Sequence, residues 1–248
     1  MAYNLRFWKP RRITIKNYPV APITFRPEII DFLETLRGVD NGDYTIRWLP
    51  TVSPLVYKAV KDVIKVVIAN NDHESCVDDL ATSLLMLFRY DREDNAITSK
   101  LRRPLTMSGQ GLTATSNVCI QRLDNPSNVL LLQENKSFSV GLNAVLPEGQ
   151  LIAEVISAYA NNTIRHQNGV FPAIIMLGTQ PTFYLIYMTP ALVEAVRSGT
   201  RPEVITIVNR FRVPTETRVN SRALLREQSA EYIAVSYNAF RKFINFNN

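Results

Sequence analysis

The eight residues Val129-Leu-Leu-Leu-Gln-Glu-Asn-Lys136 decide the fold of this chain. Four apolar residues in succession are typical of a strand that is buried on both faces. The segment Asp124-Asn-Pro-Ser-Asn128 before it is a cluster of turn formers, and residues 117–121 before the turn favour a strand. The sequence therefore predicts a β-hairpin whose second strand is central in its sheet.

Helix and strand patterns surround this hairpin. Apolar residues at three- and four-residue spacing predict an amphipathic helix from Glu74 to about Arg89. Helix signals predict further helices over 27–37, 54–69, 150–161, 190–198 and about 221–243. Strand signals predict strands over 171–178, 182–188 and about 204–211. The polar stretch over 91–111 is expected to be a loop with a short strand inside it. Helices that flank a mixed sheet make the expected fold α/β, or α+β.

The composition excludes several classes of protein. The chain has 248 residues, of which 46% are hydrophobic, enough for a sizeable core. Two cysteines and two histidines exclude a disulfide framework and a Cys- or His-rich zinc site. The first ten residues lack the apolar stretch of a signal peptide, and no run reaches the length of a membrane span. We expect an intracellular protein, nuclear or cytoplasmic, with an N-terminal extension over 1–70 and one domain over 71–248.

Charge is unevenly distributed along the chain. Residues 1–72 hold 11 basic and 7 acidic residues, residues 73–195 hold 8 and 11, and residues 196–248 hold 9 and 4. Basic flanks suit a nucleic-acid backbone, DNA or RNA, because neutralised phosphates release counterions. A solvated basic face is the alternative. The candidate nucleic-acid contacts are Arg210, Arg212, Arg218 and Arg222.

The central strand ends in a carboxylate and an ammonium group. The two-residue period of a strand places Glu134 and Lys136 on the same face. An ordinary ion pair at the solvent boundary would explain this pattern, and such pairs contribute little to stability. Glu134 and Lys136 alone therefore leave a structural and a catalytic interpretation open.

Further short sequence segments, taken in their order along the chain, favour the catalytic interpretation. They are Glu74-Ser-Cys-Val-Asp-Asp-Leu on a helix, the hairpin with Glu134-Asn-Lys136, Gln150-Leu-Ile-Ala-Glu154 on the next helix, and Gly178-Thr-Gln-Pro-Thr-Phe-Tyr184. This order resembles the PD-(D/E)xK nuclease superfamily, and the segments look like those of a group of fungal proteins with this fold. The resemblance covers about residues 70–245 and implies a restriction-endonuclease-like core.

The resemblance implies metal-dependent hydrolysis of phosphodiester bonds in nucleic acid, with Mg²⁺ or Mn²⁺ as cofactor. Acidic side chains hold such a cation, which lowers the pKa of a bound water. Carried over by position, Glu134 would be a direct metal ligand, Glu74 would hold or position the metal shell from its helix, and Lys136 would act on the attacking water. Asn117 would offer the metal one neutral oxygen. Gln150 would orient the lysine or the nucleic acid. No membrane or small-molecule cofactor is expected, and the oligomeric state is open.

One position departs from the family pattern. Asn117 stands where the family has an aspartate, which would weaken metal binding because a full negative charge is missing. Three explanations are open: a degenerate nuclease, a site that uses Asp78, Asp79 or Glu154 instead, or an engineered change. The alternative function is a catalytically inactive module that binds nucleic acid or protein. By themselves, Asp78 and Asp79 are expected to be solvated helix surface.

Overall fold

The computed structural model describes residues 62–63, 66–67, 69–70, 73–92, 94–137, 145–164, 166, 169–212, 233 and 236–244. The helix predicted over 27–37, the basic residues near the N-terminus, Arg218 and Arg222 lie outside these ranges. Described residues within the helices predicted over 54–69 and 221–243 are helical, which agrees with both predictions at those positions.

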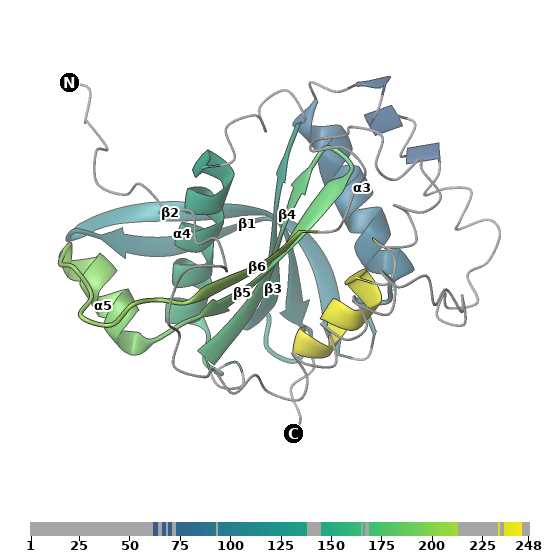
Figure 1. Ribbon diagram of the computed structural model, residues 1–248. Helices are drawn as coiled ribbons and strands as arrows, with labels where there is room; N and C mark the ends of the chain where they lie inside the picture. Colours follow the sequence, from purple (N-terminus) through teal and green to yellow (C-terminus); the bar gives the residue numbers. More distant parts are fainter. Residues whose placement is uncertain are drawn as a thin grey trace, which may run out of the picture.

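Six strands form one mixed sheet, and their order in space follows their order in the chain (Figure 1). Strands β3 and β4 are parallel, and every other neighbouring pair is antiparallel. Because parallel neighbours need a long crossover, helix α4 connects β3 to β4. The strands are β1 (Asn95–Met107), β2 (Gln110–Arg122), β3 (Val129–Lys136), β4 (Val170–Leu177), β5 (Gln180–Tyr187) and β6 (Val208–Arg212).

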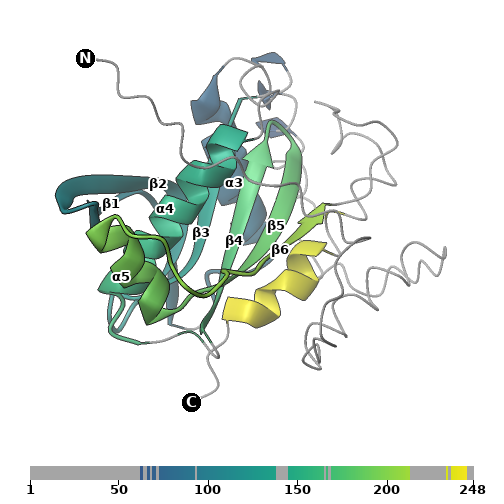
Figure 2. The ribbon, with the colours of Figure 1, turned by 60° about the vertical axis from the view of Figure 1, so that its left-hand side comes forward.

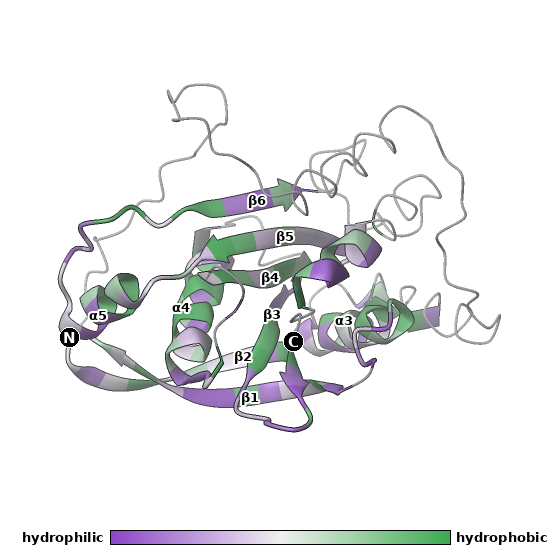
Figure 3. Cartoon of the chain, turned by 90° about the horizontal axis from the view of Figure 1, so that it is seen from below, coloured by the Kyte–Doolittle hydropathy of each residue, from purple (hydrophilic) through white to green (hydrophobic). Residues whose placement is uncertain are grey.

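Helices cover both faces of the sheet, as Figures 2 and 3 show. Helices α4 (Val145–Asn161) and α5 (Pro190–Ser198) lie on one face. Helix α3 (Glu74–Leu87) lies on the other, together with helical residues 236–240 and the short helix η3 (Arg241–Ile244). The prediction of a mixed sheet flanked by helices is confirmed, and the class is α+β. No helix in the described ranges is long and apolar enough to cross a membrane.

The prediction of a polar loop with only a short strand inside it over 91–111 is wrong in the length of the strand. Residues 95–107 form β1, a strand of 13 residues that pairs with β2 along almost its whole length. Most of its side chains are exposed or half-buried, so its sequence lacks the apolar alternation by which a strand is recognised. Its backbone hydrogen bonds with β2 stabilise the extended form instead. The turn at Ser108 and Gly109 joins the two strands, and both residues have positive φ angles.

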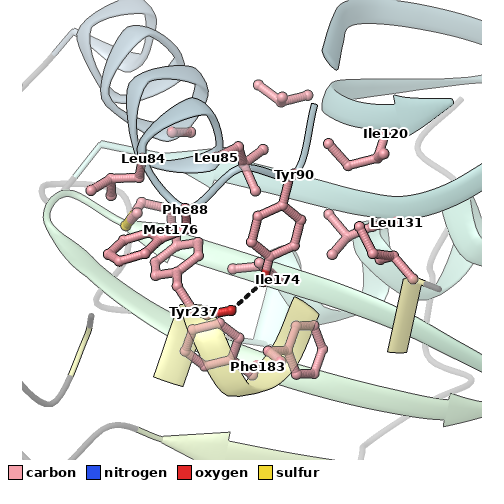
Figure 4. Packing of buried hydrophobic residues seen from close by; sticks show 14 of the residues in the cluster. Leu84, Leu85, Phe88, Tyr90, Ile120, Leu131, Ile174, Met176, Phe183 and Tyr237 are labelled. Atoms are coloured by element: carbon pink, nitrogen blue, oxygen red, sulfur yellow. Dashed lines mark hydrogen bonds between the residues drawn. The ribbon is translucent and has the colours of Figure 1, made fainter. Parts of the chain in front are cut away.

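The core on the α3 face holds the C-terminal helical segment in place (Figure 4). The ring of Tyr237 stacks on Phe88 at 5.2 Å between centroids and meets Phe183 edge-on at 5.1 Å. The buried Tyr90 hydroxyl donates a 2.7 Å hydrogen bond to the Tyr237 carbonyl oxygen. A segment more than 140 residues further along the chain therefore packs against the residues that follow α3.

Strands β2 and β3 part in the middle of the sheet. Their ladder runs as far as the pair Val118 and Gln133, and the β2 residues from Ser116 back to Gln110 pair with β1 alone. Strand β3 continues beside β4 up to Lys136. Asn117 and Glu134 are the next residues on the two strands, so they lie beside each other where the strands separate. We call this place the β2/β3 fork.

Candidate active site

Four of the residues singled out in the sequence meet at the β2/β3 fork. Glu74 begins α3, Asn117 lies on β2, and Glu134 and Lys136 lie on β3. Lys136 Nζ is 2.6 Å from Glu134 Oε1 and 3.2 Å from Glu74 Oε1. The single ammonium group therefore joins the strand carboxylate to the helix carboxylate. Glu74 is thus in contact with Lys136 and with Asn117, and Lys136 is also in contact with Glu134.

Asn117 joins β2 to α3. Its side chain is 4% exposed, and Nδ2 donates to Glu74 Oε1 at 3.1 Å and to Asp78 Oδ1 at 3.0 Å. Ionised carboxylate oxygens only accept hydrogen bonds, so these two partners decide which end of the amide faces α3. The N–H end faces the carboxylates. The amide thus satisfies two acidic groups that an aspartate at this position would repel.

Glu134 and Lys136 form a largely buried ion pair. Burial raises the pKa of Glu134, and the nearby Lys136 only partly offsets this effect. Burial lowers the pKa of Lys136, but the carboxylates of Glu134 and Glu74 outweigh it, so the pKa of Lys136 is raised. Lys136 therefore carries its proton at neutral pH. It can stabilise negative charge, for example on a phosphate, but it cannot act as a general base.

Glu154 on α4 is a second buried carboxyl group of this site. Its pKa is raised to about 9, first by burial and then by repulsion from Glu134. Glu154 is therefore a neutral acid at pH 7, next to the ion pair of Glu134 with Lys136. Gln150 Nε2 donates to Glu154 Oε1 at 3.0 Å, so Gln150 orients Glu154 rather than Lys136. The four-residue spacing of Gln150 and Glu154 places them on one helix face, and their side chains are in contact there.

Asp78 belongs to the site, so the expectation of a solvated position is wrong for it. Its side chain is 13% exposed, and Oδ1 accepts hydrogen bonds from Asn117 and from Asn135 Nδ2, the latter at 2.9 Å. Lys100 Nζ lies 2.7 Å from Asp78 Oδ2. Asp79, by contrast, is exposed, as expected. Asp78 lies one helical turn after Glu74 in the sequence, and this spacing was the signal that could have placed it in the site.

Two further residues of the site, Asn135 and Lys100, were not predicted from the sequence. Asn135 is fully buried on β3, between Glu134 and Lys136, and accepts a 3.0 Å hydrogen bond from Gln133 Nε2. An amide in the buried part of a central strand needs partners, which was the available signal. Lys100 gave no such signal, because it lies in the stretch expected to be a loop.

The cluster at the fork does not fit a divalent cation. Among the described residues, no group of three or more His, Cys, Asp or Glu side chains is arranged to hold a metal ion. The local reason is that Asn117 turns its N–H toward Glu74 and Asp78, while the ammonium of Lys136 lies between Glu74 and Glu134. Hard cations require oxygen ligands that converge on one point. Here the acidic groups are neutralised by hydrogen bonds and ion pairs instead.

The other candidate residues lie away from the fork. Arg210 and Arg212 are exposed on β6, an edge strand separated from β3 by two others. Arg210 Nη1 is 2.6 Å from Glu148 Oε1, and Glu148 also accepts a hydrogen bond from the Tyr184 hydroxyl. Asp124 lies in the β2–β3 turn and pairs with Arg122, so it does not bring a carboxylate to the fork.

No model of a protein family matches this chain, and no similar sequence was found among the curated proteins.

Proposed function

We propose that this chain is a nucleic-acid-binding domain built on a PD-(D/E)xK-type nuclease core, in which Asn117 suppresses hydrolysis of the phosphodiester bond. The observation that carries the proposal is the convergence of Glu74, Asn117, Glu134 and Lys136 at the β2/β3 fork. Glu74 meets Asn117 there, 43 residues further along the chain, and Lys136, 62 residues further along.

The residues at the fork account for binding without cleavage. Lys136 stays protonated and can attract a phosphate oxygen. The carboxylates of Glu74 and Asp78 are bound by the amide of Asn117, so they are not free to gather a cation. No step of hydrolysis is therefore assigned to this chain as it stands. Basic residues outside the fork, such as Arg212, would add contacts to the nucleic-acid backbone.

Binding and cleavage assays on three proteins test the proposal. The parent chain, Asn117→Asp and Asn117→Asp/Glu134→Gln are mixed with single-stranded and duplex DNA and RNA, with Mg²⁺, Mn²⁺ or EDTA. We expect the parent to bind with an affinity that falls steeply with salt and to leave the strands intact. Asn117→Asp should cleave in the presence of the cation, and the double variant should lose this cleavage.

Two results would overturn the proposal. One is a parent chain that binds no nucleic acid at low salt. The other is metal-dependent cleavage by the parent at the rate of Asn117→Asp, which would show that the amide does not suppress the reaction. An intact fold of each variant, checked by circular dichroism, is the control.

A further inference from the structure

Lys100 has an unusual backbone for a residue inside a strand. Its φ angle is 55°, in the left-handed region that is unfavourable for a residue with a side chain. The β1–β2 ladder is interrupted at the same place: Ser99 pairs with Val118 and Leu101 with Ser116. Lys100 and Asn117 are the two residues left between these pairs, one on each strand. Backbone strain of this kind persists where the surrounding structure requires it, often at functional sites.

This local conformation brings the ammonium of Lys100 to the rim of the fork. Lys100 Nζ is 2.7 Å from Asp78 Oδ2, while its side chain is 59% exposed. Lys136 reaches Glu74, one helical turn before Asp78, but is only 15% exposed. The two lysines thus approach the same face of α3 from two different strands. Lys100 is the more accessible of the two.

We propose that Lys100 is a second phosphate-contacting residue of the fork, an inference that rests on the nucleic-acid binding proposed above. An ammonium group has three donors, and one bond to Asp78 leaves others for an anionic oxygen. Together with Lys136, Lys100 places positive charge on both sides of Asn117. Of the two lysines, Lys100 is the more accessible to a backbone phosphate, because it is 59% exposed and Lys136 is 15% exposed.

Two substitutions separate this role from a structural one. Lys100→Met removes the charge and keeps the strained backbone, whereas Lys100→Gly removes the charge and relieves the strain. Binding of a fluorescent 20-nucleotide single strand is measured by anisotropy between 50 and 200 mM NaCl. We expect both variants to bind about fivefold more weakly at low salt and to lower the slope of log K against log salt by about 0.7. Lys100→Gly should melt at a higher temperature than Lys100→Met.

Arg197→Met is the matched control, because Arg197 is an exposed cation on α5 and its loss changes the net charge equally. Its affinity and salt slope should equal those of the parent. If the parent binds and both Lys100 variants behave like Arg197→Met, then Lys100 only neutralises Asp78, and the inference fails while the proposed function stands. If the parent binds no strand, the proposed function and the role of Lys100 fail together.

Discussion

Replacing Asn117 with aspartate should make the stability of this protein dependent on a divalent cation. The buried amide donates to Glu74 at 3.1 Å and to Asp78 at 3.0 Å. A carboxylate at the same place loses both hydrogen bonds and brings a third negative charge to within about 3 Å of the other two. Lys136 and Lys100 already pair with Glu74 and Asp78, so they do not fully neutralise the added charge.

The size of the effect follows from these contacts. Hydrogen bonds to charged groups contribute roughly 1.5 to 3 kcal/mol each. Two unit charges 3 Å apart repel by about 5 kcal/mol at an effective dielectric constant of 20, before the side chains move apart or take up a proton. Because such relaxation recovers much of this energy, we expect a net loss of about 3 kcal/mol at pH 7.5. For a chain of this size that is a fall in melting temperature of about 6 to 12 °C.

Thermal unfolding in EDTA and in increasing Mg²⁺ or Mn²⁺ measures the effect. Saturating cation at 100 times its dissociation constant should return about 2.7 kcal/mol to Asn117→Asp, whereas the parent should not respond. Asn125→Asp is the control: it adds the same charge in the β2–β3 turn and loses one exposed hydrogen bond to Thr163, which should cost less than about 1 kcal/mol. If Asn117→Asp melts within 1 °C of the parent in EDTA, the hydrogen bonds of Asn117 do not stabilise the fold. A loss that no cation restores would show that the acidic groups do not converge.

Three further predictions follow from the buried titratable groups. The pKa of Glu154 is about 9 in the folded chain, so as pH rises the unfolded chain loses this proton first, and stability falls from about pH 4.5 to pH 9. Glu154→Gln should lessen this fall by an amount on the order of 1 to 3 kcal/mol at pH 7, as measured by urea unfolding at pH 5, 7 and 9. Lys136→Met leaves Glu134 buried without its cation and should lower the free energy of unfolding by about 3 kcal/mol. Adding Glu134→Gln should recover most of this loss, and no recovery would show that the two residues are not coupled. Burial lowers the pKa of His166 to about 4, and its ring nitrogen lies 3.0 Å from the Leu130 carbonyl oxygen. Stability that is present above pH 6.5 should therefore be lost progressively toward pH 4, and His166→Gln should flatten that part of the pH profile.

Several features of the fold could be predicted from the sequence because they depend on neighbouring residues. The helix from Glu74 follows from Val77, Leu80 and Leu84 at three- and four-residue spacing, and all three are buried. The hairpin around Asp124 follows from a run of turn formers between two strand patterns. Strand β1 could not be predicted, because a strand with exposed side chains gains its stability from the backbone of β2.

The same division holds for the site. By itself, the sequence determined that Glu134 and Lys136 share a strand face and that Asn117 brings an amide where a carboxylate was expected. Only the tertiary structure decided that Asp78 leaves the solvated surface to bind Asn117, and that Lys100 turns toward it. The physical reason is distance along the chain: Asp78 contacts Asn117, 39 residues away, and Lys100, on a different strand, and no local pattern encodes either contact.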